Sequence, residues 1–331
     1  LAAIFSMFLS NTSVVVIFMS IAAAMASSSN GEITKKNTFM AIGIAAVAGG
    51  GCTLIGSTTQ LAINALLPGY GIRELSMFTL LGPGLGVILF LVIYYYFWGY
   101  ERQLKYFVFD ELQTIPSHES NTNLKQTFEK NRFHTFRKWF PLVVLLFCIA
   151  LTIIGWKNIG VIGLLGAMLV VVSGSISVKR MWETTDWNTL GVIAGSVGMA
   201  AGMRNSGACN LIAEKVVALL GIESSAIFYF AMFVLLATLM TNVMPNISTV
   251  LVLTPIAIAI ANTMGFQPFP FAIGVIWGSN MPYSTPIGAS VITMTMQGGY
   301  NFKHYVLLGL PYNIAAAISV IILTPLFYPL I

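Results

Sequence analysis

A polar stretch from Thr241 to Thr249 separates two apolar segments, 226–240 and 250–261. Neither segment alone reaches the ~20 apolar residues that a membrane-spanning helix needs. Non-helical backbone at membrane depth is tolerated only where it is buried in protein or lines a wet cavity. Pro245 removes a backbone donor and disfavours helix in the residue before it, so the chain is expected to turn here. The stretch predicts a re-entrant hairpin over 226–261 with an amide- and hydroxyl-rich tip.

The start of the chain carries a second copy of this pattern. Polar residues 10–13 interrupt the apolar segment 1–26, which predicts another re-entrant hairpin. Its Asn11 aligns with Asn246 of the later tip, and Ser13 then aligns with Ser248. The repetition indicates that the two tips are equivalent parts of an internal repeat.

Each predicted hairpin is followed by a long apolar segment that small and hydroxyl residues interrupt. These predicted broken helices cover 40–67 and 267–296. Paired interruptions at corresponding positions of two halves are the best sequence pointer to a transporter binding site. The sequence therefore predicts one site assembled from both halves.

Composition supports a membrane location for these elements. Only 8% of the residues are charged, against about 25% in ordinary soluble domains, and the mean hydropathy is +0.84. The long, continuous apolar runs favour helices over a barrel. We therefore expect an all-α polytopic protein whose surroundings are membrane lipid. We interpret the net charge of +5 as a topology signal, and no nucleic-acid partner is expected.

The predicted organisation is two repeats joined by a polar linker at 101–138. In the first repeat, 1–100, the elements are hairpin 1–26, broken helix 40–67 and span 76–98. In the second repeat, 139–331, they are spans 139–155, 159–178 and 187–203, interfacial helix 205–220, hairpin 226–261, broken helix 267–296 and span 305–330.

The positions of the basic residues predict the orientation. Loops 27–39, 101–138, 179–186 and 298–304 fall on one side and hold 12 of the 16 Lys and Arg residues. The positive-inside rule makes that side cytoplasmic. The two hairpins then enter from opposite sides, so the repeats have inverted topology. We expect a multi-pass protein of the cytoplasmic (inner) membrane.

The two predicted repeats are unequal in length. The second has three spans and an interfacial helix before its hairpin, whereas the chain opens on Leu1 inside the first hairpin. We therefore expect about 85 residues of equivalent sequence upstream of Leu1.

The chemistry available at membrane depth is neutral. All 11 acidic residues fall in predicted loops or interfacial segments, whereas proton-driven carriers generally relay through intramembrane carboxylates or histidine. Ser, Thr and Asn oxygens suit a hard cation such as Na⁺, and helix N-termini at a break favour an anion. These features predict a Na⁺-coupled carrier of a small anion. A membrane-embedded enzyme would need a nucleophile–base pair or metal cluster, so we expect no enzyme activity; a passive channel remains a rival.

Four motifs resemble those of one transporter family. Ser10-Asn11-Thr12 resembles the Ser-Asn-Thr signature at the hairpin tip of the divalent anion/sodium symporter family, within the ion transporter superfamily. Residues 51–57 resemble its glycine-threonine stretch, and Ser284-Thr285-Pro286 resembles the Ala-Thr-Pro of its second copy. Residues 187–213 resemble the segment before the second hairpin. The resemblance covers essentially the whole chain.

This resemblance implies an elevator-type carrier, usually a homodimer, that moves dicarboxylates, citrate or sulfate with Na⁺ as the coupling ion. Carried over by position, the implied substrate-binding residues are Ser10, Asn11, Thr12, Thr58, Asn246, Ile247 and Pro286. The implied Na⁺ ligands are Ser10, Asn11, Gly56 and Ser57 at one site, and Asn246, Ser248, Ser284 and Thr285 at the other.

The chain also departs from the family pattern. Its second tip reads Pro245-Asn246-Ile247 in place of Ser-Asn-Thr. Thr58-Thr59-Gln60 replaces Pro-Pro-Asn, and Ile287-Gly288 replaces the second Pro-Asn. The identity of the anion therefore stays open, and an arsenite or other anion efflux permease, or a Na⁺/H⁺ antiporter of the same superfamily, remains an alternative.

Overall fold

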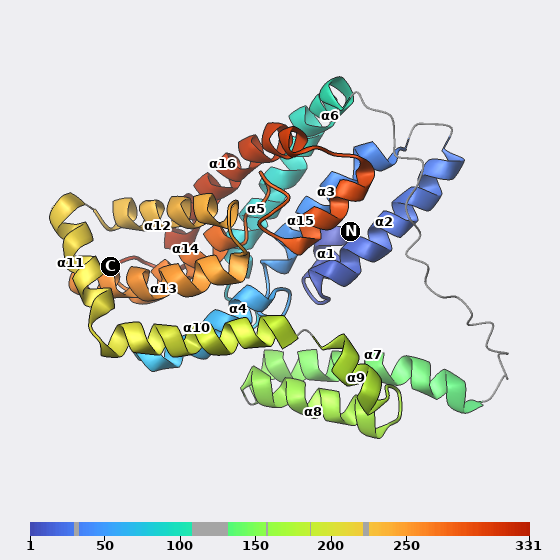
Figure 1. Cartoon of the computed structure of the whole chain (residues 1–331), viewed down its shortest axis with the longest axis horizontal. Helices are drawn as coiled ribbons and strands as arrows, with labels where there is room; N and C mark the ends of the chain where they lie inside the picture. The colour runs from blue at the N-terminus through green and yellow to red at the C-terminus, as the bar shows by residue number, and fades with distance from the viewer. Residues whose placement is uncertain (30–32, 108–131, 157, 186, 221–224) are drawn as a thin grey trace. The chain divides into compact units, whose positions relative to one another are not determined.

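Figure 1 shows a computed structural model of the chain, which is built from helices. The structure describes residues 1–29, 33–107, 132–156, 158–185, 187–220 and 225–331. Within these ranges no strand occurs. They form two compact units, Leu1–Gln113 with Val192–Ile331, and Thr114–Gly191.

The helices are α1 (Ala2–Ser6), α2 (Asn11–Ser28), α3 (Lys35–Gly50), α4 (Thr58–Leu66), η1 (Leu67–Tyr70), α5 (Leu81–Tyr94), η2 (Tyr95–Gly99), α6 (Tyr100–Tyr106), α7 (Arg132–Ile154), α8 (Ile159–Val172), α9 (Val178–Thr184), α10 (Trp187–Asn205), α11 (Ala208–Leu220), α12 (Ala226–Thr241), α13 (Asn246–Thr263), α14 (Pro268–Ser279), α15 (Ser290–Met294), η3 (Thr295–Gly298) and α16 (Phe302–Phe327).

Two helix–turn–helix pairs carry the tips that the sequence singled out. In each pair the second helix begins at the tip asparagine, so α2 starts at Asn11 and α13 at Asn246. The Ser10 hydroxyl accepts a hydrogen bond from the backbone N–H of Ser13 at 3.3 Å, as an N-cap does. Pro245 holds the equivalent position before α13, where its fixed φ favours the helix start. The polar residues from Asn11 and from Asn246 onward are therefore helical, which lengthens α2 and α13 beyond the apolar runs visible in the sequence.

Within the described ranges, four helices are long and apolar enough to cross a membrane by length and composition: Asn11–Ser28, Leu81–Tyr106, Asn246–Thr263 and Phe302–Phe327. The hairpin arms α2 and α13 are among them, since each has 18 residues, or ~27 Å of helix. The apolar segment 250–261 is by itself shorter than the ~20 residues of a spanning helix, and α13 reaches its 18 residues by including the polar tip residues from Asn246 onward.

Both expected interruptions separate helices in the structure. Non-helical backbone lies between Gly50, the last residue of α3, and Thr58, the first of α4. In the second half it lies between Ser279 of α14 and Ser290 of α15. We call these segments, 51–57 and 280–289, break 1 and break 2.

A buried indole packs against break 1. Trp277 of α14 is fully buried, and a Cβ added to Gly51 would lie 2.8 Å from its ring. A Cβ added to Gly84 of α5 would lie 2.6 Å from the same ring. Glycine at both positions therefore makes room for the indole in the core.

Several helix ends differ from the predicted element bounds. Helix α5 starts at Leu81 rather than residue 76, and α7 starts at Arg132 rather than Trp139. Lys and Arg are good helix formers, so the apolar run marked the membrane segment and not the helix start. Helix α8 ends at Val172, before a turn in which Gly174 has φ 67°. Residues 108–131 of the predicted linker lie outside the described ranges.

The helices of each unit pack through small residues. In the smaller unit α7 packs on α8, where a Cβ added to Gly166 would lie 2.6 Å from the Cys148 sulfur. In the larger unit α5 packs on α16, and Tyr312 donates a hydrogen bond from α16 to the Val87 carbonyl at 3.0 Å. A Cβ added to Gly309 of α16 would lie 1.9 Å from the Tyr283 carbonyl oxygen. Glycine there lets α16 approach the backbone of break 2.

Gly309→Ala is expected to lower the free energy of unfolding by about 1–3 kcal/mol, because the added methyl group must displace the backbone of break 2. Gly163→Ala in α8 is the matched control, since nothing lies within 4 Å of its added Cβ. Thermal unfolding of both variants in detergent measures the difference. Equal unfolding temperatures for the two variants would contradict this close approach.

Candidate functional site

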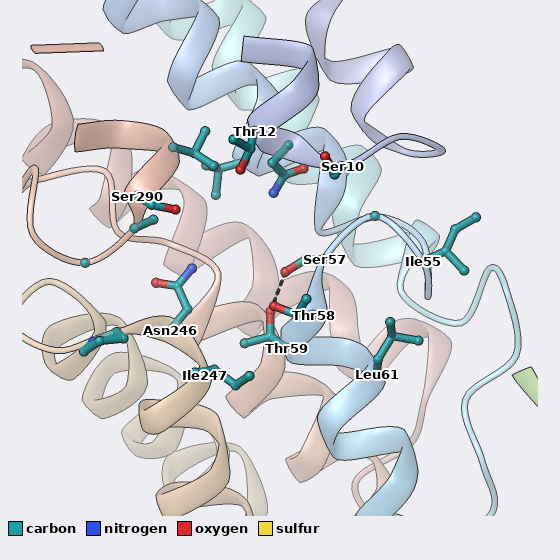
Figure 2. Close-up of a pocket in the computed structure, with 17 residues that line it drawn as sticks. Ser10, Thr12, Ile55, Ser57, Thr58, Thr59, Leu61, Asn246, Ile247 and Ser290 are labelled. Atoms are coloured by element: carbon teal, nitrogen blue, oxygen red, sulfur yellow. Dashed lines mark hydrogen bonds between the residues drawn. The ribbon is translucent and has the colours of Figure 1, made fainter. Parts of the chain in front are cut away.

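A cavity of about 300 Å³ lies within the larger unit. Figure 2 shows that its walls come from both tips and both breaks. The lining residues are Ser10, Asn11, Thr12, Val47, Ile55, Gly56, Ser57, Thr58, Thr59, Leu61, Pro245, Asn246, Ile247, Gly288, Ala289, Ser290 and Val291. The fold thus brings together residues from opposite ends of the chain.

Three helices begin at this cavity. Asn11 opens α2, Thr58 opens α4 and Asn246 opens α13, and all three line the cavity. The first N–H groups of a helix have no intrahelical acceptor, and the helix dipole adds partial positive charge there. At the starts of α4 and α13, the described residues supply no side-chain cap. The cavity therefore offers backbone donors to an anion.

The cavity has no ionisable lining side chain among the described residues. Its polar groups are hydroxyls, amides and backbone. An anion here must be met by N–H dipoles and hydroxyl donors, and a cation by neutral oxygens. This is the chemistry that the sequence predicted at membrane depth.

At the first tip the amide nitrogen of Asn11 is held by the protein. In the amide orientation that satisfies its neighbours, it donates to the Gly56 carbonyl at 3.1 Å and the Ala46 carbonyl at 3.2 Å, and to the Ser6 hydroxyl. A Cβ added to Gly50 would lie 2.0 Å from this amide, so glycine is needed beside it. The oxygen of Asn11 is then the amide atom left for a ligand.

At the second tip the amide of Asn246 is held by its oxygen. Thr241 Oγ1 donates to Asn246 Oδ1 at 2.8 Å and lies 2.7 Å from the Ser279 carbonyl oxygen. In Figure 2 the nitrogen of Asn246 points toward the space between Thr12 and Ser57. The two tips thus leave opposite ends of their amides for a ligand, an oxygen at the first and a nitrogen at the second.

The contacts that hold the two tips have the same spacing but opposite direction. In each, a hydroxyl residue five positions before the asparagine bonds its amide: Ser6 accepts from Asn11 at the first tip, and Thr241 donates to Asn246 at the second. A glycine of the following break approaches the carbonyl of that residue: an added Cβ would lie 2.8 Å away at Gly56 and 2.1 Å away at Gly288. Sequence analysis missed both hydroxyls, although their identical spacing from the asparagines was a usable signal.

Of the predicted site residues, Ser10, Asn11, Thr12, Gly56, Ser57, Thr58, Asn246 and Ile247 line the cavity. Ser248, Ser284, Thr285 and Pro286 do not belong to its lining.

Ser284 and Thr285 instead bind break 2 to the second tip. The Ser284 N–H donates to Asn242 Oδ1 at 3.0 Å, and the Thr285 hydroxyl donates to the Asn242 carbonyl. Asn313 of α16 donates to the Ser284 hydroxyl at 2.5 Å. The carbonyl of Pro286 accepts from Thr293. These contacts shape the break behind the cavity. Asn242 lies in the polar stretch that the sequence singled out but was not among the predicted site residues, and no sequence motif pointed to Asn313.

Sequence analysis also missed a link between the halves. Thr59 Oγ1 lies 2.6 Å from Ser57 Oγ and donates to Asn280 Oδ1 at 2.8 Å. Thr59 belongs to α4 in the first half, and Asn280 to break 2 in the second. Both are buried, at 1% exposure each. This bond joins the halves beside the cavity.

A protein-family model matches this chain over most of its length. The model of a family described as citrate transporter matches residues 1–252 and residues 149–330. Together these ranges cover nearly the whole chain, including every residue that lines the cavity.

Three curated relatives are transporters by name. An uncharacterised transporter of Synechocystis is 28% identical over 49% of this chain and 27% of its own length. One of Haemophilus influenzae is 25% identical over 87% of this chain and 62% of its own. A sodium-dependent high-affinity dicarboxylate transporter of Caenorhabditis elegans is 28% identical over 33% of this chain and 19% of its own. The chain spans less than two thirds of the length of each.

Thr241→Val removes the hydroxyl that holds Asn246 and break 2 while keeping the side chain's shape. We expect a loss of about 1–3 kcal/mol in the free energy of unfolding, because the Asn246 oxygen and the Ser279 carbonyl lose the one hydroxyl proton that lies within reach of both. Thr238→Val, one turn earlier in α12, is the control, since its hydroxyl donates to Val234 of its own helix. Thermal unfolding in detergent compares them, and equal losses would show that the tip contact adds nothing.

Proposed function

Since the chain belongs to the citrate transporter family, we propose that it is a Na⁺-coupled secondary transporter of a small anion. It is a transporter and not an enzyme, and its apolar helices make it a multi-pass membrane protein. Its recognition from sequence as an anion transporter of the ion transporter superfamily is confirmed. We infer that the anion is a di- or tricarboxylate, or sulfate, carried across the cytoplasmic membrane.

The observation that carries the proposal is the convergence of three helix N-termini on one uncharged cavity. Backbone N–H groups at helix starts are a ready anion site that needs no basic side chain. An anion bound in this way keeps most of its negative charge unneutralised. A co-bound cation can then supply the missing charge, which couples the two ligands.

The tip amides support separate places for the two ligands. The free oxygen of Asn11, with the Ser10 hydroxyl and the oxygens of break 1, suits Na⁺. The free nitrogen of Asn246, with the uncapped start of α13, suits the anion. We infer that, within the cavity, Na⁺ binds against the first half and the anion against the second. A second Na⁺ at Asn246, Ser248, Ser284 and Thr285 is also proposed; it would bind around the second tip, where Ser248, Ser284 and Thr285 lie outside the cavity lining.

The side chains that line the cavity favour Na⁺ coupling over proton coupling. No Asp, Glu or His lines the cavity among the described residues, so no lining group there is suited to a proton relay. The Caenorhabditis elegans relative is itself named as sodium-dependent. The same lack of carboxylates disfavours a Na⁺/H⁺ antiporter, and arsenite efflux remains the alternative that a substrate screen tests.

For the transport cycle we propose inverted repeats with two re-entrant hairpins, as the repeated tip contacts support. The repeat units would be 1–100 and 139–331, with 101–138 as a cytoplasmic linker. The substrate would move by an elevator motion of the tips and breaks within a homodimer. Pro286 would act on the substrate through the shape of break 2.

A thermal-shift screen identifies the anion. Purified protein is heated with succinate, malate, citrate, sulfate, phosphate or arsenite, each with Na⁺ and with choline in its place. A substrate raises the unfolding temperature by mass action, and a Na⁺-coupled one does so more strongly with Na⁺ present. Stabilisation only by neutral solutes would contradict the anion proposal. Equal shifts in Na⁺ and choline would contradict the coupling.

Asn246→Asp tests the anion contact. The variant keeps the oxygen that Thr241 binds but loses the N–H₂ donor and adds negative charge, so we expect anion affinity to fall at least tenfold. Asn262→Asp, exposed near the other end of α13, is the control. Uptake into proteoliposomes measures both, and wild-type uptake by Asn246→Asp would mean that the second tip is only a packed turn.

A further inference from the structure

The Thr59 hydroxyl lies between two amide oxygens. Asn280 Oδ1 is 2.8 Å from Thr59 Oγ1, and Gln60 Oε1 is 3.2 Å from it. The Gln60 amide is held in this orientation because its nitrogen donates to the Gly50 carbonyl at 3.1 Å. Amide oxygens only accept hydrogen bonds. The single proton of Thr59 is therefore committed to one of them.

This commitment decides the direction of the next hydrogen bond. Ser57 Oγ and Thr59 Oγ1 are 2.6 Å apart, so one of them donates to the other. Because the Thr59 proton is already used, Ser57 is the donor. The longer contact of Ser57 Oγ, 3.5 Å to Asn280 Oδ1, also uses the Ser57 proton inside the protein.

Ser57 lines the cavity (Figure 2). With its proton turned inward, its oxygen presents only lone pairs to the cavity. Such an oxygen attracts a cation, and it repels the oxygens of a carboxylate or sulfate.

We propose that Thr59, held by Gln60 and Asn280, makes Ser57 a cation-selective position for a hard monovalent ion such as Na⁺. Asn280 and Gln60 are positioning residues that act through Thr59. The inference rests on the proposed function, because it assumes that a cation binds beside the anion. The new element is that Asn280 of the second half, through Thr59, fixes the direction in which the Ser57 hydroxyl of the first half donates its proton.

The burial of Asn280 supports this role. Its side chain is 1% exposed, and its amide nitrogen has no partner among the described residues. A buried donor without a partner is costly, so an apolar residue would serve packing better. An apolar residue at this position could not accept the hydrogen bond from Thr59, which the Asn280 oxygen does.

Thr59→Val is the direct test. It removes the hydroxyl that accepts the Ser57 proton and passes its own proton to Asn280 or Gln60, which we call the Thr59 relay, and it keeps the side chain's shape. We expect the midpoint of the Na⁺-dependent rise in unfolding temperature, measured without anion, to move to about tenfold higher Na⁺. Thr59→Ser should restore the midpoint, because it restores the hydroxyl. Asn280→Leu should raise it about threefold, since the more distant Gln60 oxygen still holds the Thr59 proton.

The matched control is Thr324→Val in α16, which removes another buried hydroxyl that has no partner in the described structure. Its Na⁺ midpoint should equal that of the unchanged protein. An unchanged midpoint in Thr59→Val, or an equal change in Thr324→Val, overturns the relay. If Thr59→Val does not fold, Asn280→Leu decides by the same comparison. Absence of any Na⁺ response in the unchanged protein would instead refute the proposed function.

Discussion

Interrupting a helix inside an apolar protein leaves backbone carbonyls and N–H groups that must find other partners. The tips and breaks of this chain meet that requirement mainly with each other. Asn11 takes up the carbonyls of Gly56 and Ala46, the hydroxyl of Thr285 bonds the carbonyl of Asn242, and the hydroxyl of Thr293 bonds that of Pro286. These carbonyls are satisfied by side chains, whereas the starts of α4 and α13 at the cavity have no side-chain cap. The groups left to bind a ligand are therefore the uncapped helix starts and the unbonded end of each tip amide.

Hydrogen bonding within the protein also makes the two tips chemically different. The protein bonds the amide nitrogen of Asn11 but the amide oxygen of Asn246. Two tips that look alike in sequence therefore offer a ligand different atoms. An anion and a cation placed side by side need such a difference, because uniform surroundings would favour one charge over the other.

The sequence was informative where the signal was a pattern along the chain. The repeated polar interruptions predicted which residues converge, and eight predicted site residues line the cavity. It failed where the decisive contact joins residues far apart in sequence, as Thr59 and Asn280 are. It also misjudged the ends of helices. Charged residues such as Arg132 extend α7 beyond its apolar run, because helix propensity does not require hydrophobicity.

The supports of the tips are backbone atoms and glycines rather than bulky side chains. Gly50, Gly56 and Gly288 let carbonyls and amides approach directly, so the shape of the cavity depends little on which side chains stand at the tips. Pro245 and Ile247 therefore stand at the second tip without a hydroxyl, while the turn keeps its support from Thr241 and Gly288. Exchanging a tip residue would change what the cavity binds, whereas a side chain added at Gly50, Gly56 or Gly288 would clash with Asn11 or with backbone carbonyls.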